Sequence, residues 1–349
     1  MQHDSTKIDG PTVLLTGAAG VIGRAIAREL TGFRVIGLVR AGGDPGTVAG
    51  VCELVPIDLT HPKLGLARPE WRRLASEADI IVHSGALAEW GRPWPEYRAA
   101  NVEGTARVVE LAQAAGAPIH QLSTVMVLAG LLGALDSLSE GNVLVSYARS
   151  KLEAERVVAE SGVPHSVFRP TSLVGDSVTG ASSAPQIVQQ IADWFCRGRA
   201  PYFPAHPDNR IDLVPLDVTA RAVAAAVANG ELGQHYWLSY GDAALTAAEV
   251  VEVMAAHAAE RGRTIAAVPV VDPAGPLPIP FERVAPTARA YLRVLTDLSE
   301  MTRTWGGVLP TSLPLLRERF GIPDADIGQA LRASLRYWAD RRTAVADTG

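Results

Sequence analysis

Short apolar runs alternate with segments of helical periodicity along the first half of the chain. We expect strands at 12–16, 34–39, 52–57, 79–84, 118–124 and 164–169. Helices are expected at 22–31, 70–77, 96–115 and 146–161. Apolar runs without polar alternation are typical of strands buried on both faces, as in a parallel sheet. The pattern therefore predicts an α/β fold, a Rossmann-type doubly wound parallel sheet with right-handed crossovers.

Three glycines stand between the first expected strand and the first expected helix, in the sequence TGAAGVIG. Gly17 would permit a tight turn, Gly20 the close approach of phosphates, and Gly23 close packing of helix on strand. The turn leaves backbone N–H groups, including those of Val21 and Ile22, at a helix N-terminus, which binds a pyrophosphate. The segment predicts a dinucleotide site; the alternative is a glycine-rich turn without a ligand.

The end of the second strand indicates which dinucleotide binds. An NAD site places Asp or Glu near this point to accept from the ribose hydroxyls. Here the strand ends on Leu38, Val39 and Arg40, and no acid precedes Asp44. Because an arginine can pair with a 2′-phosphate, the sequence favours NADPH over NADH. The alternative is that Arg40 is a solvated charge at the strand end.

The second half of the chain is less regular. Proline-rich connections at 201–207 and 269–280 separate expected helices at 185–197, 217–229, 246–261 and 328–342. For a chain of 349 residues we expect two unequal domains. Residues 1–175 are assigned mainly to an NADP-binding domain, to which elements at 205–240 return. Residues 176–349 are assigned mainly to a smaller, partly helical substrate-binding lobe that closes over the cofactor.

Composition excludes several classes of function. The net charge is −5 and no basic run is present, which argues against a nucleic-acid partner. Cys52 and Cys196 lie far apart without metal-ligand spacing, so we expect a reducing compartment and no metal. His83 and His120 are expected to be packed rather than ligating. No apolar run reaches the ~18 residues of a membrane span, and the first residues lack the apolar core of a signal peptide. The expected location is cytoplasmic.

Tyr147 and Lys151 lie four residues apart in an expected helix, so their side chains share one face. A lysine ammonium beside a phenol stabilises the phenolate and lowers the pKa of the tyrosine. Such a tyrosine can give a proton to an oxygen whose carbon receives a hydride. Upstream, Ser123 and Thr124 end an expected strand, and either hydroxyl can hold the substrate oxygen. The alternatives are a surface Tyr and Lys pair and an ordinary strand-end turn.

Together these features resemble the extended short-chain dehydrogenase/reductases. In that family the catalytic hydroxyl precedes a valine by three residues, which selects Thr124, and the resemblance implies that Tyr147 is the acid/base. It also implies that Lys151 holds the nicotinamide ribose. Further cofactor contacts are implied at Asp58 and Leu59 for the adenine, at Ser84, Gly85 and Ala86 under the cofactor, and at Pro170 and Thr171, after Arg169, near the nicotinamide.

A narrower resemblance is to the thioester reductase branch, which includes terminal reductase domains of carboxylic acid reductases and peptide synthetases. It rests on 57–105, RIDLVPLDVTARAV at 210–223 and VRAGG at 39–43, and covers about 12–240. That branch prefers NADPH. Two departures are expected: Ser84-Gly85-Ala86 replaces the usual Asn-Ala-Ala, and we expect no attached adenylation or carrier domain. We therefore expect a carrier-bound substrate to arrive in trans.

The expected reaction is NADPH-dependent reduction of an acyl thioester, bound to a carrier protein or to CoA, to an aldehyde or alcohol. The alternatives are a ketone or aldehyde reductase or nucleotide-sugar epimerase, and a non-catalytic NADP-binding regulator. The apolar segment 125–138 either lines an acyl channel or simply packs, and Trp90 and Trp94 either wall the pocket or fill core. An acidic carrier would need a local arginine cluster, for which the candidates are Arg92, Arg98, Arg197 and Arg199. The expected assembly is a monomer or homodimer.

Overall fold

The computed structural model describes residues 10–43 and 45–346. The chain divides into two compact units, each of which is built from three stretches of sequence. The first contains Met1–Ser123, Ser150–Phe168 and Ala220–Tyr236, and the second Thr124–Arg149, Arg169–Thr219 and Trp237–Gly349. The second unit therefore includes 124–149 as well as most of the chain after 169. The assignment of cofactor and substrate roles to the expected domains stays a prediction.

A seven-stranded sheet forms the centre of the first unit, in the order β11-β6-β5-β4-β1-β2-β3. Its strands are β1 (Thr12–Thr16), β2 (Arg34–Arg40), β3 (Glu53–Ile57), β4 (Ile80–His83), β5 (Ile119–Leu122), β6 (His165–Pro170) and β11 (His235–Leu238). Neighbouring strands from β3 to β6 pair in parallel. Strand order reverses beside β1, the point at which such sheets bind ligands. The predicted doubly wound parallel sheet is confirmed.

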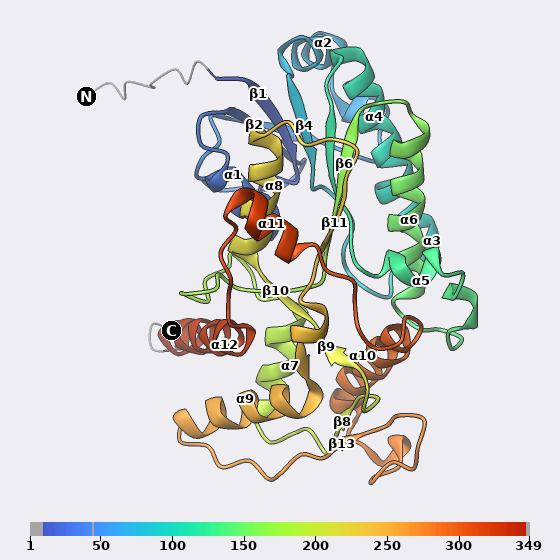
Figure 1. Cartoon of the computed structure of the whole chain (residues 1–349), viewed down its shortest axis with the longest axis vertical. Coiled ribbons are helices and arrows are strands. Elements are labelled where there is room, and N and C mark those ends of the chain that lie inside the picture. Colours follow the sequence, from blue (N-terminus) through green and yellow to red (C-terminus); the bar gives the residue numbers. More distant parts are fainter. Residues whose placement is uncertain (1–9, 44, 347–349) are drawn as a thin grey trace. The chain divides into compact units, whose positions relative to one another are not determined.

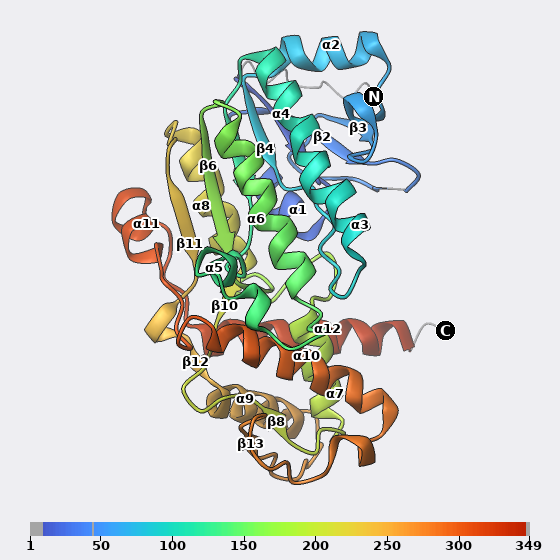
Figure 2. The same ribbon diagram turned by 90° about the vertical axis from the view of Figure 1, so that its right-hand side faces the viewer.

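Helices cover both faces of this sheet (Figures 1 and 2). One face carries α2 (Arg68–Glu77), α4 (Glu103–Ala115) and α6 (Val145–Glu160), and the other α1 (Val21–Glu29) and α8 (Leu216–Ala228). Side chains from β1, β2, β4 and β5 pack with those of α2, α4 and α6 in one buried cluster, which includes Leu14, Ile36, Ile81, Ile119, Leu74, Val108 and Val158. Burial of this apolar surface fixes the strands from which the site residues emerge.

Two expected boundaries differ from the structure. The expected helix 96–115 is divided into α3 (Trp94–Tyr97), a π-helical turn η2 (Arg98–Val102) and α4. Within η2 the Asn101 side chain bonds both backbone groups of Leu87, which gives the interrupted helix a tertiary contact. The expected strand 118–124 ends at Leu122, so Ser123 and Thr124 follow the strand rather than belong to it.

The second unit combines short strands with helices. Its short strands are β7 (Ser172–Val174), β8 (Phe203–Pro204), β9 (Arg210–Ile211), β10 (Leu213–Pro215), β12 (Leu245–Thr246) and β13 (Val270–Val271). Its helices are α5 (Val127–Leu131), α7 (Ile187–Cys196), α9 (Ala247–Glu260), α10 (Pro286–Arg303), α11 (Leu313–Phe320) and α12 (Ile327–Ala346). Helices α7, α9 and α12 pack against one another. Three of the expected helices become α7, α9 and α12, whereas α10 and α11 were not expected.

The apolar segment 125–138 folds into α5 and the short turn η3 (Leu135–Ser137). Val125, Met126 and Val127 are buried, which agrees with plain packing for that part. Leu131 and Leu132, by contrast, are 50% and 57% exposed. The segment therefore has a packed base and an exposed apolar tip.

Candidate active site

The glycine loop after β1 is closed by backbone contacts that leave no room for a side chain at Gly17 or Gly23. Gly17 has φ +68°, in the left-handed region, and a Cβ there would lie 2.8 Å from the Gly85 nitrogen. A Cβ at Gly23 would lie 2.1 Å from the Gly17 carbonyl oxygen, so α1 packs directly on the turn. Gly20 caps α1, and a Cβ there would meet only the Gly17 oxygen, at 3.1 Å. The loop has the shape of a backbone cradle at a helix N-terminus.

The loop after β4 lies against this cradle. The Gly85 N–H donates to Thr16 Oγ1 over 2.9 Å, and a Cβ on Gly85 would lie 3.3 Å from Leu59. The structure thus brings Gly17, Gly85 and Leu59 together. Glycine replaces the alanine that is usual at the centre of this triplet, and a Cβ there would approach Thr16 Oγ1 to 3.1 Å. Ser84 and Ala86 flank this contact.

His83 at the end of β4 supports the same loop. Its ring nitrogens bond Thr16 Oγ1 at 2.8 Å and Thr105 Oγ1 at 3.0 Å. Burial, and then the charge of Lys151, lowers the pKa of His83 to about 3. His83 is therefore a packed, neutral histidine, as the sequence predicts. His120 is also buried and bonds Ser166 Oγ.

Three further cofactor candidates lie on the first unit. Val21 and Ile22 are the first residues of α1 and are half-buried. The Asp58 carboxylate accepts from the hydroxyl and the N–H of Thr60, which lowers the pKa of Asp58. Its other oxygen lies 2.8 Å from His61 Nδ1. Asp58 thus organises its own turn, and its adenine contact stays a prediction.

Two arginines differ in how they are held near this cradle. Arg40 ends β2 with an exposed side chain that makes no hydrogen bond or ion pair with the residues described. Arg24 of α1, which the sequence reasoning missed, donates to the carbonyls of Ala19, Thr47 and Pro45. It ties the glycine loop to the segment that follows β2. An arginine one turn into the helix after such a loop was the available signal.

Lys151 is held in place by burial and a short hydrogen bond. Its side chain is buried, and Nζ donates to the Leu122 carbonyl over 2.6 Å. Burial lowers the pKa of Lys151 to about 8, against the opposing charge of Glu155, one turn further along α6. Tyr147 lies one turn before Lys151 on the same helix and is half-buried. The predicted helical spacing of the pair is therefore observed.

Both candidate hydroxyls after β5 are buried. The Ser123 N–H donates to the Phe168 carbonyl over 2.7 Å, which prolongs the β5–β6 pairing by one bond. Thr124 Oγ1 accepts from the Met126 N–H at 3.3 Å, and an accepting hydroxyl keeps its hydrogen for donation. Ser123 Oγ has no hydrogen-bond partner among the residues described. Neither observation separates the two residues, so the Ser123 and Thr124 hydroxyls both stay candidates for holding the substrate oxygen.

The turn after β6 is joined to the motif at 210–223. Arg169 is buried with its guanidinium 4.4 Å from the centre of the Trp237 ring. Thr171, which follows Pro170, donates its hydroxyl to the Asp212 carbonyl over 2.9 Å. The Asp212 carboxylate accepts from the N–H groups of Tyr240 and Gly241. Burial nevertheless raises the pKa of Asp212 to about 7.

Helix α10 holds the segment that leads into α6. Glu300 accepts from the N–H and hydroxyl of Ser139, at 2.7 and 2.6 Å, and from the Asn142 amide at 2.9 Å. The Val143 N–H donates to Asp297 over 3.0 Å. The clamped residues lie two to six positions before α6. This clamp was missed because its partners are more than 150 residues apart in sequence.

Three of the four expected cluster arginines pair with nearby acids. Arg92 pairs with Glu89 at 2.7 Å and Arg98 with Glu103 at 3.4 Å, both in the first unit. Arg197 of the second unit pairs with Asp193. These pairs do not show the expected cluster.

Within 10–43 and 45–346, no group of three or more His, Cys, Asp or Glu can hold a metal, and no helix there could cross a membrane.

The family model described as male sterility protein matches residues 47–223, about half of the chain. The chain belongs to this family. It is an NAD(P)-dependent oxidoreductase of the extended short-chain dehydrogenase/reductase type, with a nicotinamide cofactor.

Relatives of this oxidoreductase include much longer proteins. A linear gramicidin synthase protein of Brevibacillus parabrevis is 30% identical over 243 residues, which cover 60% of this chain and 5% of that protein. The carboxylic acid reductase of Segniliparus rugosus is 30% identical over 279 residues, which cover 64% and 23%. The chain thus spans less than a quarter of either relative.

Solved structures show the same architecture over nearly the whole chain. The terminal R domain from the myxalamid PKS-NRPS biosynthetic pathway superimposes with a TM-score of 0.71 at 25% identity, and covers 95% of this chain and 91% of that one. The reductase domain of a nonribosomal peptide synthetase from Mycobacterium tuberculosis gives a TM-score of 0.65 at 23% identity, covering 95% and 93%. At 23% identity, the likeness to the Mycobacterium tuberculosis domain is evidence for a shared fold alone.

Proposed function

We propose that this oxidoreductase uses NADPH to reduce an acyl thioester to an aldehyde or alcohol. The observation that carries the proposal is Lys151, buried and held to the Leu122 carbonyl, one helical turn after Tyr147. A lysine one turn from a tyrosine on the same helix face has a chemical use, because a nearby cation tunes a phenol for proton transfer. The alternative, that Tyr147 and Lys151 are an exposed pair on the helix surface, does not agree with a Lys151 side chain that is only 6% exposed.

The residues of the glycine loop fit a dinucleotide. Side chains are absent where the backbone turns, at Gly17, and where α1 begins, at Gly20. We propose that the pyrophosphate lies on the N–H groups at the start of α1, including those of Val21 and Ile22. Ser84 to Ala86 and Leu59 would complete the cofactor contacts.

The NADPH preference rests on the end of β2. Arg40 is exposed there and makes no ion pair with the residues described, so it is available to a 2′-phosphate. No carboxylate ends β2 to repel that phosphate. We propose that Arg40 selects NADPH.

When bound, the reduced nicotinamide supplies a hydride. We propose that Tyr147 then protonates the carbonyl oxygen as its charge develops, and that Thr124 donates a hydrogen bond to the same oxygen. With a pKa of about 8, Lys151 is mostly protonated at neutral pH and stabilises the Tyr147 phenolate that remains. Hydride on carbon and a proton on oxygen give a thiohemiacetal, which releases a thiol and leaves the aldehyde.

The thioester assignment is supported by the relatives and by two linked motifs. The names of the relatives refer to gramicidin synthesis and carboxylic acid reduction. The motifs at 169–171 and 210–223 meet through Thr171 and Asp212. We propose a carrier protein or CoA as the donor of the acyl group, an apolar acyl chain, and a monomer or homodimer in the cytoplasm. Two free cysteines, Cys52 and Cys196, agree with a reducing compartment.

A substrate panel tests this function. NADPH oxidation is followed with octanoyl-pantetheine, octanoyl-CoA, a long-chain ketone and a nucleotide sugar, and products are identified by mass spectrometry. We expect aldehyde or alcohol from the thioesters. Turnover of the ketone or the nucleotide sugar with none of either thioester would refute the thioester assignment. Cofactor binding without turnover of any carbonyl would favour a non-catalytic NADP-binding regulator.

A further inference from the structure

The second unit gathers arginines where three helices meet. Helices α7, α9 and α12 pack together, and arginines lie on α12 and just after the ends of α7 and α9. We call this surface the arginine face; it consists of Arg197, Arg261, Arg263, Arg332, Arg336, Arg341 and Arg342. Only one of them, Arg197, was among the candidates from sequence.

Ion pairs show that these arginines converge. Asp193 of α7 pairs with Arg197 at 2.9 Å and with Arg342 of α12 at 2.6 Å. Glu260 of α9 pairs with Arg336 of α12 at 2.8 Å. Each carboxylate thus joins α12 to a neighbouring helix.

The remaining arginines border the same network. Arg261 pairs with Asp340, and the charge of Arg332 helps Arg336 to lower the pKa of Glu260. Burial raises the pKa of the Cys196 thiol to about 11, and the charges of Arg263 and Arg342 act against that rise. The nearby His257 is buried, which lowers its pKa and favours the neutral ring.

The face carries an excess of positive charge. Among the residues described, the seven arginines of this face have three carboxylates as ion-pair partners, Asp193, Glu260 and Asp340, so the arginines exceed these partners by four charges. The whole chain carries −5, so the remainder is strongly acidic. Cations after Cys196 and Glu260 also offset the C-terminal dipoles of α7 and α9, but this does not explain Arg341, in the interior of α12. The excess is a local field that attracts an acidic partner.

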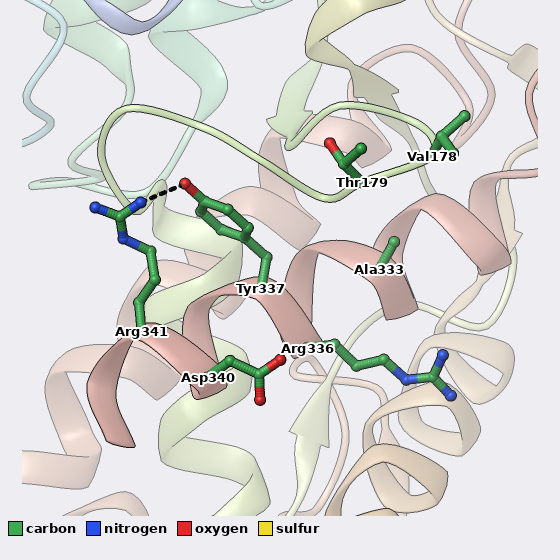
Figure 3. A pocket seen from close by; sticks show the side chains of 7 residues that line it. All are labelled: Val178, Thr179, Ala333, Arg336, Tyr337, Asp340 and Arg341. Atoms are coloured by element: carbon green, nitrogen blue, oxygen red, sulfur yellow. Dashed lines mark hydrogen bonds between the residues drawn. The ribbon is translucent and has the colours of Figure 1, made fainter. Parts of the chain in front are cut away.

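A hollow of about 490 Å³ beside α12 adjoins the arginine face (Figure 3). Its lining includes Val178, Tyr337, Arg336 and Arg341. Arg341 donates to the Tyr337 hydroxyl over 2.6 Å, and its guanidinium lies 5.3 Å from the centre of the Tyr337 ring. Exposed Val178 with tyrosine and arginine side chains around it matches the composition of protein–protein interfaces, which are enriched in aromatic residues and arginine.

The other wall of the hollow is a rigid turn. Val178 at its tip is 83% exposed. Asp176 Oδ1 accepts from the N–H groups of Val178 and Thr179. Gly180 has φ +69°, and a Cβ there would lie 2.1 Å from the Ala333 carbonyl of α12. The turn therefore packs directly on α12, and the exposed valine is held in a fixed position.

We propose that the arginine face and this hollow dock the acidic carrier protein that presents the acyl thioester. The inference rests on the proposed function, chooses the carrier protein rather than CoA as the donor of the acyl group, and adds the surface that binds it. The charge excess extends over three helices, which suits the acidic surface of a protein better than a single phosphate group. Two proteins of net negative charge repel each other at long range, and a basic patch of this kind steers them into one orientation.

The test compares a carrier-bound substrate with the same acyl group on a small thiol. The variant R263E/R341E reverses two charges that make no ion pair with the residues described, so the observed ion pairs stay intact. The matched control is R68E/R72E, which makes the same charge change on exposed positions of α2. V178D is a second variant, at a position too exposed to affect folding.

The substrates are an octanoyl-loaded acyl carrier protein and octanoyl-pantetheine. We expect R263E/R341E and V178D to lower kcat/KM for the carrier-bound substrate about tenfold or more at low salt. Neither variant should change kcat/KM for octanoyl-pantetheine, and the control should change neither value. About 0.5 M salt should remove most of the difference made by R263E/R341E. An unchanged kcat/KM with the carrier, or an equal loss with both substrates, would overturn the docking surface.

Failure of the proposed function has a separate signature. If no thioester is reduced, binding of the unacylated holo-carrier protein to native enzyme and variants is measured by calorimetry. Weaker binding by R263E/R341E than by R68E/R72E would still support the docking surface. Equal binding, or none by the native enzyme, would overturn it.

Discussion

Replacement of Gly23 by alanine should destabilise the fold although alanine favours helices. The new Cβ would lie 2.1 Å from the Gly17 oxygen, 2.8 Å from the Gly17 carbonyl carbon and 2.9 Å from the Ala18 Cα. All three atoms are backbone, so the turn or α1 must move by about 1 Å to restore ordinary contact. Overpacking of this kind costs about 1–3 kcal/mol or more, against about 1 kcal/mol gained from helix propensity. We expect a net loss of about 1–2 kcal/mol.

Replacement of Gly20 by alanine tests cofactor binding separately from folding stability. A Cβ at Gly20 would meet only the Gly17 oxygen, at 3.1 Å. Gly20→Ala should therefore change the free energy of unfolding by less than about 1 kcal/mol. The methyl group would nevertheless stand where the pyrophosphate approaches the start of α1, and NADPH affinity should fall about tenfold or more. Gly275→Ala is the matched control, because a Cβ at Gly275 would make only ordinary contacts, of 3.4 Å or more, with Asp272.

Two measurements on the three variants decide between these roles. Urea unfolding gives the free energy of unfolding, and nicotinamide fluorescence gives the dissociation constant of NADPH. Native stability of Gly23→Ala would refute the packing argument. Native NADPH affinity of Gly20→Ala would show that the pyrophosphate binds elsewhere.

Three further predictions concern single side chains. Arg40→Ala should weaken NADPH binding by ~1.5–3 kcal/mol and spare NADH; equal affinities of the native enzyme for both would contradict this. The folded-state pKa of His83, about 3, lies below the unfolded value of 6.5, so the unfolded state takes up the proton first. Stability is then lost as pH falls below 6.5, by up to ~1.4 kcal/mol per pH unit, and His83→Gln should flatten that slope in urea unfolding between pH 4 and 7. Glu300→Gln weakens the hold on Ser139 and Asn142 and should lower kcat about tenfold while the KM for NADPH is unchanged; an unchanged kcat would show that the clamp does not position α6.

Local patterns predicted the sheet and much of the candidate site. Strands such as β1 and β2 are apolar on both faces, which identifies them as buried strands. The glycines of the loop and of the first turn of α1 mark a left-handed turn at Gly17 and a close backbone contact at Gly23. Tyr147 and Lys151 belong to one helix, so their spacing alone placed them together. These features depend on residues that are near one another in sequence.

Features made by distant residues were not predictable in this way. The Ser139–Glu300 contact joins positions 161 residues apart, and α10 offered no motif to identify its partner. The arginine face depends on how α7, α9 and α12 pack, which charge patterning along the chain does not encode. The interruption of the expected helix 96–115 depends on Asn101, whose side chain bonds Leu87 on another segment.

Transfer of an isotopic label tests the central claim most directly. The enzyme is incubated with 4-deuterated NADPH of each face and octanoyl-pantetheine, and the product is analysed by mass spectrometry. We predict deuterium on C1 of octanal or octanol from one of the two faces only. Tyr147→Phe should bind NADPH normally and lose about 10²–10⁴-fold of this transfer. No deuterium in the product, or transfer by Tyr147→Phe within a few-fold of the native rate, would contradict the account.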